Sequence, residues 1–495
     1  MAESSSYKNI FKSTFLFGFV QIFNIIVKVV LNKFVALLLG PEGMGVIGIY
    51  HTVVNMIKTG AGLGISQSAV RDISEANTQQ DENRFSKIIS LTNYVIIFTS
   101  LLGIVATIVL APQLSKWYFS DSSHTLAFMW ISLVVGLNIL TDGQLAILKG
   151  MRQLRALAKA SMYGSIVGLI TGVPCYYLWG QGGIVPSLLV STFSSLLFSN
   201  YFVRKVKYDL VIFKFKEAVE GAKPMVKMGV ALMLVGFFGY IFDMIIAAYI
   251  SRSGSLADVG YFNAGAAIIT SYFGIVITAM STDYYPRISA VHNDSTKLSD
   301  EMNKQSETGL VLIFPLVVLF VFLSPYFIQI LYSSEFGPTN DYTDYAMLGT
   351  VIIVVSNTMG MILLAKQASN IFVFSVLCQK LLLIGIYILG YTTFGLMGLG
   401  FSYIMTGVVH LVFMIFILRH FFSIGLSGKN YRLLAFILII TICTVFVRKI
   451  DNIAICYIIG AILCVFSGMF TYLYMKKVMD INVLSVVKNK IKKHK

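Results

Sequence analysis

Fourteen apolar segments, each long enough to cross a bilayer, divide this chain of 495 residues. A membrane-spanning helix needs about 20 mainly apolar residues, and in lipid only helices or closed barrels satisfy every backbone polar group. We therefore predict an all-α polytopic membrane protein with about 14 transmembrane helices. The expected spans are residues 13–38, 46–70, 87–111, 125–148, 157–179, 183–203, 226–250, 259–282, 306–331, 345–365, 370–391, 396–418, 432–449 and 453–475.

The basic residues lie on alternate sides of these segments. A net charge of +15 suggests nucleic-acid binding at first, but 30 of the 38 lysines and arginines fall in loops and tails on one side. This is the pattern of the positive-inside rule. It places the N- and C-termini in the cytoplasm and removes the argument for a nucleic-acid partner.

Sequence landmarks recur at a spacing of about 215 residues, so segments 1–6 match segments 7–12. Six is an even number, and the two halves then insert in the same orientation. We predict two six-helix repeats related by a pseudo-twofold axis along the membrane normal, followed by two C-terminal helices. The landmark pairs are Gly45 and Gly260, Pro112 and Pro325, Tyr118 and Tyr332, Lys149 and Lys366, and Gly183 and Gly398.

The repeat and the charge runs define five predicted regions. Residues 204–227 hold seven lysines and arginines and form a basic cytoplasmic linker between the halves. The others are an N-terminal lobe (1–203), a C-terminal lobe (228–420), the extra helices (421–477) and a basic cytoplasmic tail (478–495).

Four lysines fall inside the apolar segments, where each central charge costs about 2.5–3.5 kcal/mol to insert. Polar residues at spacings of three and four share one helical face with them in the first two segments. Such stripes favour a water-filled cavity that binds an anion. The residues expected to bind substrate are Lys28, Lys33, Lys58, Lys380, Asn24 and Asn55.

The alternative is structural pairing of these lysines within the helix bundle. Asp142 and Asp243 are the candidate acids, and two acids cannot neutralise four lysines. The same two residues are candidates for ion coupling or gating. Lys149, Arg152 and Lys366 lie at cytoplasmic helix ends, where they either anchor lipid head groups or guard the mouth of the cavity.

No pattern in the chain indicates an enzyme. The five cysteines and six histidines form neither a CxxC pair nor an HExxH motif, so we expect no catalytic residue, no metal site and no bound cofactor. If the predicted cavity serves transport, a proton gradient, a sodium gradient or the membrane potential can supply the energy.

Several stretches resemble a known family. Residues 31–34 running into 40–45 are similar to the first hairpin of the polysaccharide (O-antigen type) flippases of the multidrug/oligosaccharidyl-lipid/polysaccharide exporter superfamily. Leu148–Arg152, Val259–Ala264 and Tyr284–Ser289 agree, and the resemblance covers about residues 10–420. Of the cavity lysines, only Lys33 lies in a matching stretch.

The resemblance implies a flippase of the bacterial inner membrane. Its substrate would be an undecaprenyl-diphosphate-linked oligosaccharide, moved from the cytoplasmic to the periplasmic leaflet by alternating access, with cavity lysines on the diphosphate. Membrane lipids and a polysaccharide polymerase are the expected partners. Many such flippases have 12 helices, whereas 14 is the number in lipid II flippases, so a lipid II flippase stays an alternative. A multidrug or organic-cation exporter of the same superfamily is another.

Overall fold

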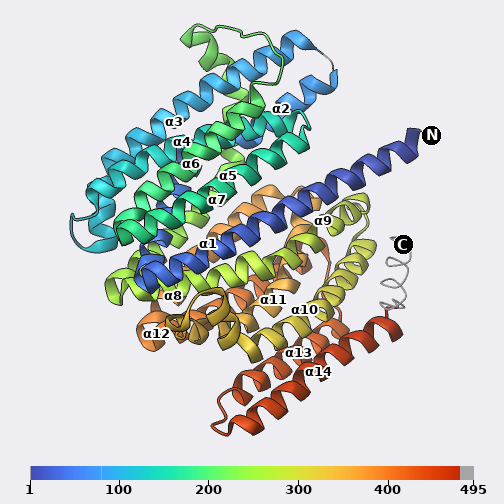
Figure 1. Ribbon diagram of the computed structural model, residues 1–495. Coiled ribbons are helices and arrows are strands. Elements are labelled where there is room, and N and C mark those ends of the chain that lie inside the picture. The colour runs from blue at the N-terminus through green and yellow to red at the C-terminus, as the bar shows by residue number, and fades with distance from the viewer. Residues whose placement is uncertain (1, 80, 480–495) are drawn as a thin grey trace, which may run out of the picture. The chain divides into compact units, whose positions relative to one another are not determined.

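The computed structural model describes residues 2–79 and 81–479, and these form helices with short connections and no strand (Figure 1). The predicted all-α fold is confirmed. The predicted tail lies outside the described residues from position 480 onward. The α-helices are α1 (Ala2–Ala61), α2 (Ile65–Gln79), α3 (Glu82–Phe119), α4 (Thr125–Gly150), α5 (Leu154–Trp179), α6 (Ile184–Val203), α7 (Phe215–Ser253), α8 (Leu256–Ala267), α9 (Gly274–Ala290), α10 (Ser295–Leu331), α11 (Thr339–Ala365), α12 (Ser369–Phe422), α13 (Gly428–Val447) and α14 (Ile453–Lys477).

Ten helical stretches among the described residues are long and apolar enough to cross a membrane. Three of them, with 40, 50 and 53 residues, are long enough to cross twice, since 40 helical residues extend about 60 Å and the hydrocarbon core is about 30 Å thick. Each of the three contains a glycine with positive φ, namely Gly40, Gly180 or Gly395. These glycines break the helical path, and each long stretch therefore corresponds to two of the predicted spans.

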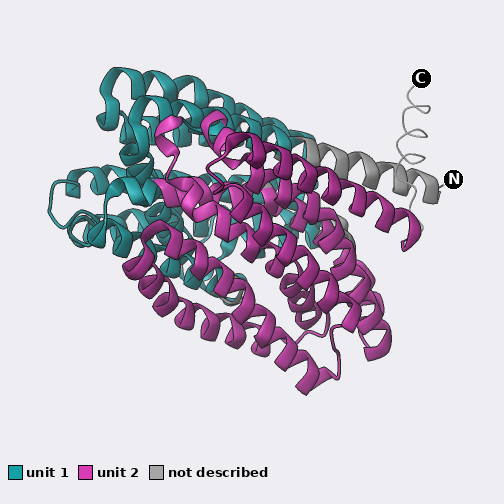
Figure 2. Ribbon diagram, turned by 90° about the horizontal axis from the view of Figure 1, so that it is seen from below, with its two compact units in different colours: residues 1–260, 331–333 teal, residues 261–330, 334–495 magenta. Residues whose placement is uncertain are grey.

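The chain forms two compact units, coloured separately in Figure 2. The first unit is Met1–Gly260 with Leu331–Ser333, and the second is Tyr261–Ile330 with Ser334–Lys495. Helix α7 belongs to the first unit, where it contacts α1, α2 and α3. The predicted lobe boundaries stay predictions.

In the first unit, α4 contacts α2, α3 and α6, and α5 contacts α1 and α6. The segment between α6 and α7 is extended from residue 207 to 214 and follows α3. The backbone N–H of Asp209 donates to Ser86 Oγ at 3.1 Å, and that of Val211 donates to Ser90 Oγ at 3.0 Å. Hydroxyl groups of α3 therefore accept the hydrogen bonds of two backbone N–H groups that lie outside any helix.

In the second unit, α11 contacts α9, α12 and α13, and α13 contacts α14. A charged cluster ties the end of α13 to two other helices. Arg448 lies 2.5 Å from the Asp344 carboxylate of α11 and also donates to Ser324 of α10. The Asp344 side chain is only 5% exposed. The two extra helices are therefore an integral part of this unit.

Local geometry recurs at the spacing predicted from the sequence. Arg152 after α4 and Gln367 after α11 both have positive φ, of 55° and 56°, and lie 215 residues apart. The next N–H in each case returns to a carbonyl five residues earlier, at Leu148 and Leu363, and so closes the helix end. In this register, Lys366 corresponds to Met151 and not, as predicted, to Lys149. The symmetry axis itself stays a prediction.

The predicted pair Gly45 and Gly260 meets in space. A Cβ added to Gly45 would lie 2.0 Å from the Leu256 carbonyl oxygen, and one added to Gly260 would lie 2.0 Å from the Pro41 carbonyl oxygen. Each glycine thus packs on the carbonyl that lies four residues before the other. Such reciprocity is what equivalent positions facing each other produce.

Candidate functional site: a cationic face in the first unit and a cavity in the second

The centre of the candidate site is a cationic face on α1. Lys28 lies before the break at Gly40, whereas His51 and Lys58 lie after it. His51 is within electrostatic range of both lysines, and the side chains of Lys28 and His51 are exposed in the structure. The break in α1 thus brings together two polar stripes that the sequence places 20–30 residues apart.

Within the described residues, Lys58 forms an ion pair with one acid. Its Nζ lies 3.0 Å from Asp142 Oδ2 of α4, and the two side chains are 25% and 40% exposed. A cavity of about 30 Å³ beside the pair is lined by Gly62, Ser66 and Thr99 among others, which is room for a water molecule. The pairing that the sequence left as an alternative is therefore present for this lysine.

Asn24 is engaged by α5. Its Nδ2 donates to Ser161 Oγ at 2.9 Å, and Ser165 Oγ donates to its Oδ1 at 3.0 Å. Both ends of the amide are therefore occupied by helix packing. Asn55 lies half-buried between His51 and Lys58 on the same stretch of α1, and it is the predicted amide that shares their part of the helix.

The other predicted residues of the first unit lie on α1, on α7 and at the end of α4. Lys33 is half-buried in α1, and Asp243 is exposed on α7. Lys149 in the last turn of α4 and Arg152 just after it are both exposed. A cation near a helix C-terminus is favoured by the helix dipole, so these two residues also have a local structural role.

The second unit holds the remaining predicted lysines. Lys366 caps the end of α11, with its Nζ 5.8 Å from the centroid of the Phe422 ring. Lys380 of α12 lines a cavity of about 470 Å³. Gln379 and His410, which were not predicted as site residues, line the same cavity. Sequence periodicity does place Gln379 and Lys380 together, but it carries no sign that His410 faces them.

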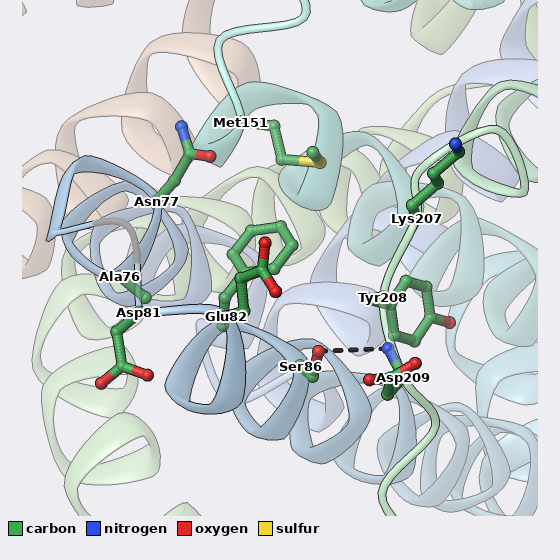
Figure 3. Close-up of a pocket in the computed structure, with 10 residues that line it drawn as sticks. Ala76, Asn77, Asp81, Glu82, Ser86, Met151, Lys207, Tyr208 and Asp209 are labelled. Carbon is green, nitrogen blue, oxygen red and sulfur yellow. Dashed lines mark hydrogen bonds between the residues drawn. The ribbon is translucent and has the colours of Figure 1, made fainter.

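A larger hollow of about 630 Å³ lies beside the extended segment 207–214 (Figure 3). It is lined by residues of α2, α3 and that segment, including Asn77, Glu82 and Lys207. Ser86, whose hydroxyl accepts a hydrogen bond from the Asp209 N–H, forms part of the wall. No lysine predicted to bind substrate lines this hollow.

No group of three or more His, Cys, Asp or Glu residues suited to a metal ion occurs within the described part of the chain. The five cysteines are free there. What the arrangement can do chemically is bind anions and polar groups with lysine, imidazole and amide side chains. These features define a polytopic helical membrane protein with polar and cationic sites in both units, the class to which transporters belong.

Comparisons with known proteins identify the family. A family model described as polysaccharide biosynthesis protein matches residues 34–341. The lipid III flippase of Escherichia coli (strain K12) is 21% identical over 403 residues, covering 77% of this chain and 91% of that protein. The chain belongs to the polysaccharide biosynthesis protein family, and the predicted membership of the exporter superfamily is confirmed.

Solved structures show the same fold. A lipid II flippase, MurJ, in an inward closed conformation is 15% identical with a TM-score of 0.69, covering 94% of this chain and 100% of that one. An inward-facing multidrug resistance MATE family transporter of the MOP superfamily is 18% identical with a TM-score of 0.64, covering 79% and 93%. The chain therefore has the fold that this flippase and this transporter share.

Proposed function

We propose that this protein is a flippase that moves an undecaprenyl-diphosphate-linked oligosaccharide from the cytoplasmic to the periplasmic leaflet of the bacterial inner membrane. The observation that carries the proposal is the cationic face of α1, where Lys28 and Lys58 both lie within electrostatic range of His51. The family match and the similarity to a lipid III flippase support it. Both termini would be cytoplasmic, and membrane lipids and a polysaccharide polymerase would be partners.

The charges fit the head group of such a lipid. A diphosphate carries at least two negative charges and needs cations in a site shielded from bulk water, where electrostatic attraction is stronger. Lys58 is already paired with Asp142 at 3.0 Å, so a diphosphate would compete with that carboxylate for the ammonium group. We propose that the exchange is part of the transport cycle: the freed Asp142 then takes up a proton or stays in water. Lys33 is proposed to contribute further positive charge in the first unit, and Lys380 is proposed to bind the substrate within the second unit.

Alternating access accounts for the rest of the cycle. The polyprenyl tail stays in the bilayer, and only the head group has to cross. As the head group leaves water, polar side chains along its path must take over its hydrogen bonds, because burying a polar group without a hydrogen bond is costly. Asn55 is the amide best placed on the cationic face, because Asn24 would first have to break two hydrogen bonds with α5.

The reconstituted protein provides the test. Proteoliposomes would receive a fluorescent undecaprenyl-diphosphate oligosaccharide, and its appearance at the far leaflet would be followed. We expect flipping by the wild type and a loss of at least tenfold for Lys28→Ala, Lys58→Ala and Lys380→Ala. Lys297→Ala is the matched control, since this exposed lysine forms an ion pair with Asp294, three residues before it. Wild-type protein that moves no diphosphate lipid contradicts the proposal.

Coupling is tested separately. Asp142→Asn and Asp243→Asn would be assayed under imposed proton and sodium gradients. If one of these carboxylates couples transport to an ion gradient, its replacement should make the flipping rate insensitive to that gradient. Unchanged gradient dependence in both variants excludes both aspartates as coupling groups but leaves the flippase proposal intact.

A lipid II flippase is the second candidate. The number of predicted spans and the fold shared with MurJ over 94% of the chain favour it. The same proteoliposomes loaded with fluorescent lipid II distinguish the two, because the substrates differ in the head group and not in the diphosphate. An organic-cation exporter is the third candidate. Lysines on the site argue against it, since cations prefer carboxylates and aromatic faces.

A further inference from the structure

We propose that the cavity of the second unit is a binding subsite for a saccharide ring of the transported head group. It is built by α9, α11 and α12 without residues of the first unit. The inference rests on the proposed function in assigning the ring to a transported lipid. The subsite itself, however, can be tested with soluble sugars.

The size of the cavity suits a small polar molecule. Its volume of about 470 Å³ falls in the range of about 300–1,000 Å³ that is usual for ligand pockets. Polar groups enter from all three helices. They are Ser281 of α9, Asn357 of α11, and Gln379, Lys380, Thr406 and His410 of α12.

Gln379 gives the clearest sign of a missing partner. The residue is 92% buried, and its Nε2 has no hydrogen-bond partner within the described residues. Buried amide groups in folded proteins nearly always have a partner, and leaving one without a partner is unfavourable. Gln379 also lines the cavity. Rotation of the amide toward the cavity would let Nε2 donate to an acceptor there, such as a sugar hydroxyl.

His410 stands in a fixed orientation in the same wall. Its Nδ1 lies 2.8 Å from Ser356 Oγ of α11, which holds the imidazole ring in place. A second hydrogen bond joins the wall residue Thr406 to Tyr387 OH at 3.4 Å. His410 and Thr406 are therefore held by the protein before any ligand arrives, which lowers the entropic cost of binding.

The remainder of the wall is apolar, with Ile353, Phe372 and Leu383 among its residues. A pyranose ring has the same division: hydroxyl groups on its edge and C–H groups on its faces. Among the described residues that line the cavity there is no carboxylate, whereas Lys380 is one of them. This charge disfavours an organic cation and favours a neutral or acidic sugar.

Saturation-transfer NMR on the full-length protein in detergent tests the subsite. The probes are the methyl glycosides of glucose, N-acetylglucosamine and glucuronic acid, which carry no lipid and no phosphate. We expect at least one glycoside to receive saturation from the wild type. We also expect binding weaker by about tenfold in Gln379→Leu and in Asn357→Leu. Gln181→Leu, at an exposed position of the first unit, is the matched control and should bind as the wild type does.

Gln379→Leu is also informative about folding. Nε2 of Gln379 has no hydrogen bond to lose within the described residues, and leucine is of similar size, so the variant should melt close to the wild type. Absence of saturation transfer to all three glycosides, or equal binding by Gln379→Leu and wild type, overturns the subsite. Glycoside binding without lipid flipping would instead refute the flippase proposal, and flipping without glycoside binding would refute only the subsite.

Discussion

The reciprocal packing of Gly45 and Gly260 predicts that a single methyl group at either position destabilises the first unit. In Gly45→Ala the new Cβ would lie 2.0 Å from the Leu256 carbonyl oxygen, and real Cβ atoms essentially never approach closer than 3.0 Å. The two helical segments must therefore separate by at least about 1 Å. The obstacle is backbone on both sides, so no side chain can rotate out of the way.

Overpacking of this kind costs about 1–3 kcal/mol. At about 2 °C per kcal/mol for a unit of this size, the melting temperature should fall by about 2–6 °C. Intrinsic fluorescence of the detergent-solubilised protein during heating provides the measurement. Gly239→Ala is the matched control, because nothing lies within 4 Å of a Cβ at that helical position. It should be neutral or stabilising by about 1 kcal/mol.

The double variant gives a sharper test. Gly45→Ala and Gly260→Ala push the same two segments apart, so the first substitution makes part of the room that the second needs. The combined loss should be smaller than the sum of the single losses, as expected for residues in contact. Additive losses in the double variant would refute the packing argument. A Gly45→Ala protein that melts within about 1 °C of the wild type would also refute it.

Three further predictions follow from the ion pairs and the linker. Lys58→Ala should change stability by only about 0–1 kcal/mol, since its pair with Asp142 is part-exposed. A large fall in melting temperature would show that the lysine is structural. Arg448→Met should cost up to about 3–5 kcal/mol, because it leaves the buried Asp344 carboxylate without its cation. The neighbouring Lys449→Met, which loses a bond to Tyr345 OH at an exposed site, should be nearly silent in the same melting assay. Ser86→Ala with Ser90→Ala removes the acceptors of two backbone N–H groups and should speed proteolysis within residues 207–214, whereas cleavage unchanged from wild type would contradict the described docking.

Much of the fold could be predicted because a membrane simplifies the problem. Long apolar segments can only be helices there. The repeat spacing also predicts that Gly45 and Gly260 are equivalent positions. Asp142 was a candidate partner for a lysine because buried acids are few. These inferences need only composition, period and charge.

The rest depends on contacts between residues far apart in sequence. Asn24 shares a helical face with Lys28, but only the packing of α5 shows that Ser161 and Ser165 occupy its amide. His410 reaches the cavity of Gln379 because α11 and α12 pack together. Segment 207–214 follows α3 because serine hydroxyls of α3 accept hydrogen bonds from its backbone N–H groups. The sequence of a helix does not show which backbone N–H group its serines will bind. Periodicity determines the face of a helix, not its neighbour.

The pair of glycines also constrains how such a chain can change over time. Neither Gly45 nor Gly260 has positive φ, so the backbone at each position would accept any residue if its counterpart were absent. The requirement for glycine comes from the helical segment that faces it. A substitution at either position is therefore constrained by the backbone next to the other. We expect these two positions to remain matched even where every neighbouring residue has drifted apart.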